Sequence, residues 1–120
     1  MQDPNCLFCK IVAGEIPSQK VHEDGEVLAF RDIRPLAPVH VLLVPKKHIT
    51  SLYDVAPADE KVLGRMLALA PALAKAQGAA DGFRTIVNTG RVGRQEVQHL
   101  HIHVIGGGEP LGPMLPRKDS

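Results

Sequence analysis

The chain is poor in aromatic residues, in cysteine and in excess charge. Of its 120 residues, 3% are aromatic, none is tryptophan, and the only two cysteines are Cys6 and Cys9. The formal net charge of +1 gives no general electrostatic case for nucleic-acid binding, which needs a basic face or a strongly basic pI. The hydrophobic fraction of 44% is sufficient to build a core. These values predict a globular protein with no nucleic-acid partner.

The chain also lacks the segments that direct a protein to a membrane. Met1 to Asn5 contain no basic region followed by an apolar one, so no signal peptide is expected. No apolar run approaches the roughly 18–20 residues that cross a bilayer. We therefore expect a cytoplasmic protein without a membrane partner, formed by a single domain over residues 1–120. In that compartment both cysteines are expected to be reduced.

Apolar spacing and turn residues predict an α+β fold. Asp24-Gly25 is a hairpin turn signal, and Pro71 should kink the longer of two helices. The order of elements predicts an antiparallel sheet of about five strands, with helices on one face and a strand edge or helix face left for a partner subunit. The predicted helices are Asn5–Ala13 and Ala56–Gln77, and the predicted strands are Lys20–Glu23, Glu26–Arg31, Val39–Val44, Phe83–Asn88 and Val97–Ile105.

Three histidines alternate with aliphatic residues in the last predicted strand. Alternation places His99, His101 and His103 on one face, while Leu100, Ile102 and Val104 point into a core. Three imidazoles on one face favour metal binding or catalysis over packing. The preceding loop, residues 90–96, can present backbone N–H groups to a phosphate. A phosphate held against an imidazole is suited to nucleophilic attack at phosphorus.

These residues match a known sequence pattern. The run from His99 to Ile105 resembles the histidine triad (HIT) superfamily, and the ending from Gly106 to Leu115 resembles its bacterial HINT branch. Related uridylyltransferases carry glutamine at the last triad position, so His103 argues against them. Further matching segments are Phe8-Cys9-Lys10-Ile11, Glu15-Ile16-Pro17, Ala29-Phe30-Arg31-Asp32-Ile33, Ala37-Pro38-Val39-His40-Val41-Leu42, Val44-Pro45-Lys46-Lys47-His48-Ile49, Asn88-Thr89-Gly90 and Gly93-Arg94-Gln95-Glu96-Val97.

The resemblance implies the HIT fold, a homodimer with joined sheets, and a purine nucleoside phosphoramidase activity. Such enzymes cleave the P–N bond of nucleoside phosphoramidates of the AMP-NH2 or AMP-lysine type and release the nucleoside monophosphate. By the match, His101 attacks phosphorus, His103 holds the phosphate and assists the leaving amine, and His99 braces the site. Residues 109–120 would contribute to the dimer or to the active-site rim. Hydrolysis of dinucleoside polyphosphates and a regulatory nucleotide-binding role are the alternatives.

The resemblance also implies a nucleotide pocket. Asp32 would accept hydrogen bonds from the ribose hydroxyls, and the alternative role for it is that of a turn residue after a strand. For the apolar residues that would contact the base, the alternative role is packing in the hydrophobic core. Arg94 and Gln98 depart from many relatives, which have glycine and an aromatic residue there. The residues implied for the base wall are Phe8, Ile11, Phe30 and Ile33, and those implied for the phosphate pocket are Asn88, Gly93, Gln95, Glu96 and Val97.

The two cysteines have the spacing of a zinc ligand pair. Some bacterial histidine triad proteins hold a structural zinc ion with these cysteines and two histidines, which are matched here by His48 and His99. This Cys₂His₂ set would close a tetrahedral site with no open position, so no catalytic metal is expected. The alternative is a pair of reduced, buried cysteines that pack the first helix.

Overall fold

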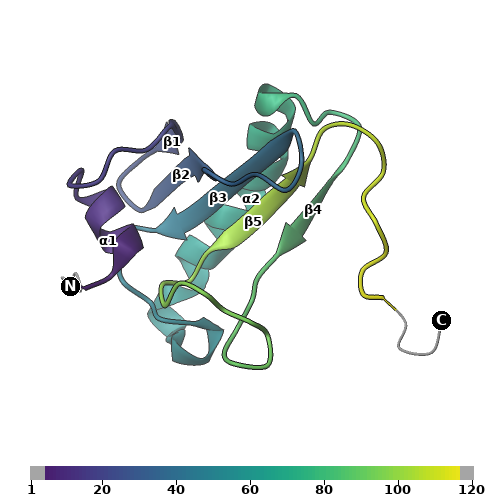
Figure 1. Cartoon of the computed structure of the whole chain (residues 1–120). Coiled ribbons are helices and arrows are strands. Elements are labelled where there is room, and N and C mark those ends of the chain that lie inside the picture. Colours follow the sequence, from purple (N-terminus) through teal and green to yellow (C-terminus); the bar gives the residue numbers. More distant parts are fainter. Residues whose placement is uncertain (1–4, 117–120) are drawn as a thin grey trace.

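The computed structural model describes residues 5–116, which form a five-stranded antiparallel sheet in the order β1-β2-β3-β5-β4 (Figure 1). The α+β fold with one long and one short helix is therefore confirmed. The helices are α1 (Leu7–Val12) and α2 (Glu60–Gln77), with 3-10 turns at Leu52–Asp54 and Pro57–Asp59, and the strands are β1 (Lys20–Glu23), β2 (Val27–Arg31), β3 (Val39–Pro45), β4 (Phe83–Ile86) and β5 (Ile102–Gly106).

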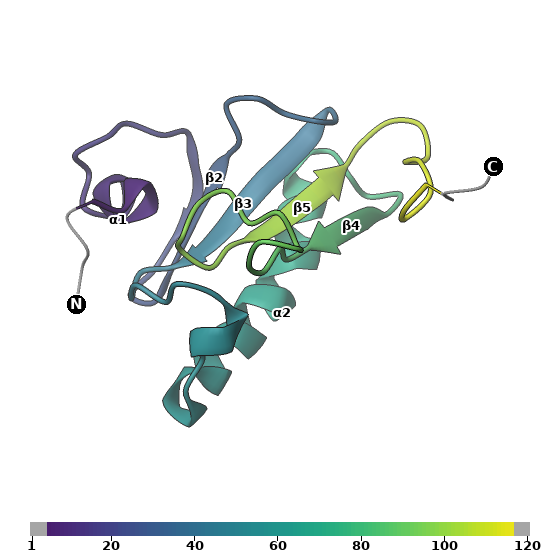
Figure 2. The same ribbon diagram turned by 60° about the horizontal axis from the view of Figure 1, so that its bottom comes forward.

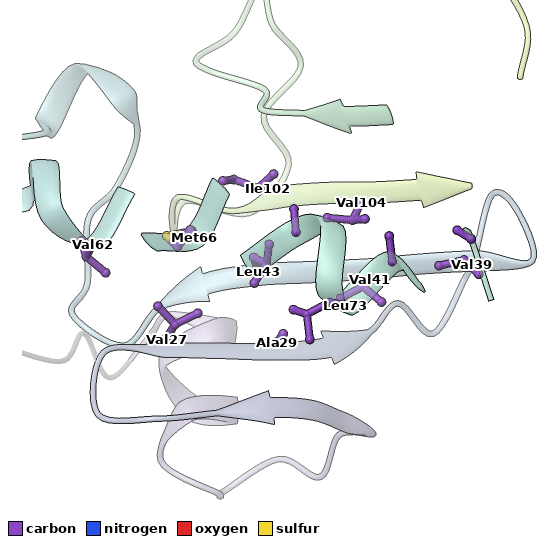
Figure 3. Packing of buried hydrophobic residues seen from close by; sticks show 13 residues of the cluster. Val27, Ala29, Val39, Val41, Leu43, Val62, Met66, Leu73, Ile102 and Val104 are labelled. Carbon is purple, nitrogen blue, oxygen red and sulfur yellow. The ribbon is translucent and has the colours of Figure 1, made fainter. Parts of the chain in front are cut away.

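The main core lies between α2 and one face of the sheet (Figure 3). Strand β3 is central and buried along its whole length, as expected for a run of valine and leucine paired on both sides. Met66 of α2 is fully buried against this face. The sheet residues of this core are Val27, Ala29, Val39, Val41, Leu43, Ile102 and Val104.

The opposite face of the sheet carries a second cluster, which is covered in part by α1. Because side chains alternate along a strand, Leu28, Phe30, Leu42 and Val44 point away from α2 and pack against Phe8 of α1 and its neighbours. Figure 2 shows α1 and α2 on opposite sides of the sheet. The expectation of helices on one face only was wrong, because β2 and β3 are apolar on both faces.

Helix α1 starts later than predicted. Its N-cap is Cys6, whose sulfur accepts the backbone N–H of Cys9 at 3.2 Å, so Asn5 is not the cap. Gly14, with φ of +80°, follows the helix as expected, since this conformation favours glycine. The cap therefore brings the side chains of both cysteines to the same side of α1.

The last two strands are shorter than predicted. Strand β5 begins at Ile102 rather than Val97, and β4 ends at Ile86 rather than Asn88. The backbone N–H of Leu100 donates to Ile49 O at 2.7 Å, so this part of the chain bonds to the segment after β3 and not to a strand. His99 and His101 therefore precede the strand, and of the three triad histidines only His103 lies within it.

Helix α2 begins at Glu60, because Pro57–Asp59 form a 3-10 turn where the prediction had helix. The helix continues through Pro71, which is exposed, and ends at Gly78 with φ of +110°. None of the helices within residues 5–116 combines the length and the apolar character needed to cross a membrane.

The hairpin turn between β1 and β2 is held by Asp24. Its Oδ1 accepts the backbone N–H groups of Glu26 and Val27 at 2.8 and 3.0 Å. Its Oδ2 lies 2.6 Å from His22 Nε2 and 2.6 Å from Nη2 of Arg65, a residue of α2. Burial alone would raise the pKa of Asp24, but the hydrogen bonds from these four donors hold it well below its ordinary value. Asp24 therefore ties the hairpin to α2.

Replacing Asp24 with alanine should lower the free energy of unfolding at pH 7 by about 1–3 kcal/mol, because backbone donors and a guanidinium lose their acceptor. The pKa of Asp24 is lower in the folded chain, so its contribution is complete above the unfolded pKa of about 3.9 and is lost as the pH falls further. Urea unfolding of both proteins should therefore show a difference that shrinks in acid. Asp81→Ala, in an exposed turn, is the control. A difference independent of pH would contradict this role.

Candidate functional site

The open part of the sheet face beside α1 carries two histidines from neighbouring strands. The register pairs Leu42 of β3 with His103 of β5, and His40 lies two residues before Leu42 on the same face. His40 Nε2 is 2.9 Å from His103 Nδ1 and 3.4 Å from Asp32 Oδ2. The carboxylate follows directly after β2, so three strands bring these groups together.

Hydrogen bonds determine which ring nitrogens carry protons. The backbone N–H of Leu36 donates to His40 Nδ1 at 3.1 Å, so a neutral His40 carries its proton on Nε2. That Nε2–H donates to His103 Nδ1, which leaves the proton of a neutral His103 on Nε2. The two hydrogen bonds from Leu36 through His40 thus leave the ring N–H of a neutral His103 at Nε2, the nitrogen that does not face His40.

Burial keeps both of these rings neutral. Burial, together with the neighbouring imidazoles of His101 and His40, lowers the pKa of His103 to about 4, against the opposite effect of Asp32. Burial also lowers the pKa of His40, and the charge of Asp32 acts in the opposite direction. At neutral pH each ring therefore has one N–H and one lone pair, as the hydrogen-bond pattern requires.

His101 has the opposite proton arrangement to His103. Its Nδ1 lies 2.7 Å from the carbonyl oxygen of His99, which can only accept, so Nδ1 carries the proton and the Nε2 of a neutral ring has a lone pair. The centres of the His101 and His103 rings are 5.0 Å apart. Phe8 packs edge-on against His101, with 5.1 Å between ring centres. A potential nucleophile and a potential donor therefore lie side by side.

The side chain of Gln95 stabilises the glycine-containing loop, residues 90–96, that precedes the histidines. Gln95 Nε2 donates to Thr50 O at 2.7 Å and to Val97 O at 3.0 Å, and Gln95 Oε1 accepts Gly90 N–H at 3.1 Å. The Gln95 amide is thus occupied by the chain itself, and its side chain supports the loop. A Cβ atom at Gly93 would lie 2.4 Å from a backbone oxygen, so this position requires glycine.

The other residues implied for the nucleotide pocket differ in exposure. Phe8, Ile11 and Phe30 are buried in the cluster under α1, whereas Ile33 is 92% exposed. Asp32 Oδ1 accepts Arg34 N–H at 2.8 Å, so Asp32 also has the turn role considered from the sequence. Of the loop residues implied for the phosphate, Glu96 is exposed, while Asn88 and Val97 are partly buried.

A second cluster joins α1 to the segments around Ile49 and Leu100. Cys6 Sγ lies 3.2 Å from His99 Nδ1, and Cys9 Sγ lies 3.2 Å from His48 Nδ1. The two Nδ1 atoms are 3.2 Å apart, and all four potential ligand atoms lie within 4.8 Å of one another. We call Cys6, Cys9, His48 and His99 the Cys–His cluster. These residues could hold a metal ion.

The geometry of the Cys–His cluster fits zinc. Bonds of about 2.0–2.1 Å to nitrogen and 2.3 Å to sulfur place the ligands of a tetrahedral zinc site about 3.3–3.8 Å apart. The Nε2–H of His99 donates to Pro45 O at 2.8 Å, which leaves the lone pair on Nδ1, the atom that faces both sulfurs. Burial lowers the pKa of His99 to about 4 and raises that of the Cys6 thiol to about 11. A cation would favour the thiolate that this buried environment otherwise disfavours.

Sequence reasoning missed His40 as a site residue, although its segment was part of the family match. A signal was present, because His40 is the single polar residue of a strand that otherwise consists of valine, leucine and proline. A buried polar side chain needs a partner, and alternation from Leu42 places it on the face opposite the main core. Which strand supplies that partner became visible only in the folded chain.

The fold and the paired histidines together define a class of protein. Comparison with known families identifies this class. Residues 13–109 match the HIT domain family, and the chain belongs to this family. A histidine triad protein from Clostridium difficile, whose structure has been solved, superposes with a TM-score of 0.88 at 45% identity, over 94% of this chain and 99% of that one. The fold expected from the sequence is thereby confirmed.

Two curated relatives carry informative names. The purine nucleoside phosphoramidase of Escherichia coli (strain K12) is 50% identical over 113 residues, which is 93% of this chain and 94% of that protein. The 14 kDa zinc-binding protein of Brassica juncea is 48% identical over 103 residues, or 84% of this chain and 91% of that protein. The chain therefore matches nearly the whole length of both relatives.

Proposed function

We propose that this protein is a purine nucleoside phosphoramidase that cleaves the P–N bond of nucleoside 5′-phosphoramidates. The observation that carries the proposal is the pair of hydrogen bonds that orient two adjacent imidazoles, His101 Nδ1 to the His99 carbonyl and His103 Nδ1 to His40 Nε2. They leave a lone pair on the Nε2 of a neutral His101 and a proton on the Nε2 of a neutral His103. A nucleophile and a hydrogen-bond donor side by side suit attack at a phosphoryl group. The name of the Escherichia coli relative supports the same reaction.

In the proposed reaction, the His101 Nε2 lone pair attacks phosphorus and the P–N bond breaks. The leaving nitrogen takes a proton from solvent water as the P–N bond breaks, and the nucleotide remains bound to His101 as a nucleotidyl-histidine. The Nε2–H of His103 hydrogen-bonds to the phosphoryl oxygen, where negative charge develops. Water then attacks phosphorus and gives up a proton to solvent, and the bond between phosphorus and His101 Nε2 breaks. This step releases the nucleoside monophosphate and restores the His101 lone pair. The His99 carbonyl holds His101 in the reactive tautomer throughout.

The nucleotide would lie across the sheet face beside α1. Asp32 has its Oδ2 within 3.4 Å of His40, and we propose that its carboxylate accepts the ribose hydroxyls. Phe8, Phe30 and Ile11 would support the base from the buried cluster, and the exposed Ile33 would cover it. The loop that the Gln95 side chain supports would offer backbone N–H groups to the phosphate, and those of Gly93, Glu96 and Val97 are the candidates. Asn88 would line the same phosphate pocket.

Replacing His101 with alanine should reduce the release of AMP from adenosine 5′-phosphoramidate by more than about 1,000-fold, because the nucleophile is removed. His103→Ala should reduce it less, since only a hydrogen bond is lost. Release of AMP can be followed by chromatography.

His22→Ala, which removes an imidazole of β1, is the control and should leave turnover nearly unchanged. Normal turnover by the His101 variant would exclude it as the nucleophile. Faster hydrolysis of a dinucleoside polyphosphate than of the phosphoramidate would favour the other branch of the superfamily.

We also propose that the Cys–His cluster binds one structural zinc ion. The spacing of its four ligand atoms and the name of the Brassica juncea relative support this assignment. The purified chain should contain about one zinc per molecule, and Cys9→Ser should lose most of it, as measured by atomic emission. His22→Ala should keep its zinc, and equal zinc contents in the three proteins would refute the site.

Because thiolate ligands require reduced cysteines, we propose a cytoplasmic location.

We further propose that residues 1–120 form a single domain that assembles as a homodimer with joined sheets. Strand β4 is an edge of the sheet, and its Phe83 is 38% exposed. An uncovered strand edge is suited to pairing with a second strand. The tail residues Met114 and Leu115 are exposed and would reach the interface or the site rim. Light scattering should give about twice the mass of 13.0 kDa, and Phe83→Glu should lower it, whereas Leu67→Glu on α2 should not.

A further inference from the structure

One residue of the Cys–His cluster also contacts the proposed catalytic pair, His101 and His103. The ring of His99 is fully buried and turns its Nδ1 toward Cys6 Sγ at 3.2 Å and Cys9 Sγ at 3.5 Å. The carbonyl oxygen of the same residue accepts the Nδ1–H of His101 at 2.7 Å. Whatever fixes the position of His99 therefore also fixes the ring of the proposed nucleophile.

Phe8 makes a second connection between the two places. It lies between Cys6 and Cys9 in sequence, is 4% exposed, and packs edge-on against His101 with ring centres 5.1 Å apart and an angle of 90° between the rings. Phe8 also contacts Phe30 at 5.5 Å and His99 at 6.0 Å between ring centres. The position of both cysteines thus determines where this aromatic ring meets the nucleotide site.

Helix α1 cannot hold this arrangement by itself. It has six residues, which is far below the roughly 12–15 at which an isolated helix becomes even marginally stable. Its position depends on packing of its buried face and on the contacts that Cys6 and Cys9 make with His48 and His99. A metal ion bonded to these four residues would fix α1 against the segment that carries the nucleophile.

We propose that metal loading of the Cys–His cluster and nucleotide binding are coupled through Phe8 and the His99 carbonyl, so that each increases the affinity for the other. The inference rests on the proposed function, since it takes the surface beside His101 as the nucleotide site. Coupling of this kind is reciprocal, because the four states of the protein form a closed thermodynamic cycle. The factor by which Zn²⁺ strengthens AMP binding must therefore equal the factor by which AMP strengthens Zn²⁺ binding.

The test measures both factors on the full chain. Calorimetry gives the Kd of AMP for the zinc-loaded and the chelator-treated protein, and competition with a chromogenic chelator gives the Kd of Zn²⁺ with and without saturating AMP. We expect both ratios to agree and to be about tenfold, which is within the usual range for coupled sites. Two ratios close to one would refute the coupling while leaving the proposed function intact. Failure of the zinc-loaded protein to bind AMP would instead refute the proposed function.

A pair of variants on α1 identifies the coupling route. Phe8→Leu keeps all four metal ligands but loses the ring contact with His101, so the coupling ratio should fall to about half of the wild-type value or lower. Leu7→Ala changes a neighbouring side chain that is 46% exposed, so its ratio should be unchanged. If Phe8→Leu weakens AMP binding but retains the full ratio, the proposed route is wrong.

A spectroscopic measurement tests the His99 contribution without any nucleotide. In zinc-loaded protein labelled with ¹⁵N-histidine, the Nδ1–H of His101 should give a proton signal protected from exchange, because it donates to the His99 carbonyl. Removing Zn²⁺ should speed its exchange with solvent by about tenfold or more, whereas the His40 Nε2–H that faces His103 should change less. Equal exchange of the His101 proton in both forms would contradict the proposal.

Discussion

The backbone register between β3 and β5 places an imidazole from each strand within hydrogen-bonding distance of the other. With Leu42 opposite His103, the side chain of His40 lies diagonally across from His103, and His40 Nε2 lies 2.9 Å from His103 Nδ1. A shift of one residue would turn His103 into the main core and bring Ile102 or Val104 to the open face. The apolar packing of β5 against α2 resists such a shift, so the core itself specifies the site.

Backbone groups, and not charged side chains, determine how the histidines are protonated. The carbonyl oxygens of Pro45 and His99 accept hydrogen bonds from His99 Nε2–H and His101 Nδ1–H, and the N–H of Leu36 donates to His40 Nδ1. Backbone groups cannot titrate, so these tautomers persist wherever the rings remain neutral. Burial, which lowers the pKa of His99 and His103, extends that condition over the neutral pH range.

Much of the fold and part of the site followed from the sequence. Apolar runs and turn residues predicted the strand at Lys20–Glu23 with the bounds observed, and those at Val39–Val44 and Phe83–Asn88 with an error at one end. The Cys-x-x-Cys spacing predicted a ligand pair. The prediction of a strand from Val97 failed because the N–H of Leu100 bonds to Ile49 O, a contact across 51 positions that no local pattern contains. The side-chain alternation nevertheless continues, since Leu100 is buried while Phe8 contacts both His99 and His101.

The sequence by itself determined which chemical groups are present, the class of fold and the family, because residue types, periodicity and motif spacing are local properties of the chain. Only the tertiary structure decided what each group does. It brought His48 and His99 to the two cysteines, joined His40 to His103, and used the Gln95 amide to brace a loop. The reason is physical: tautomers, ligand sets and burial depend on partners that lie far away in the sequence and become neighbours only when the core closes.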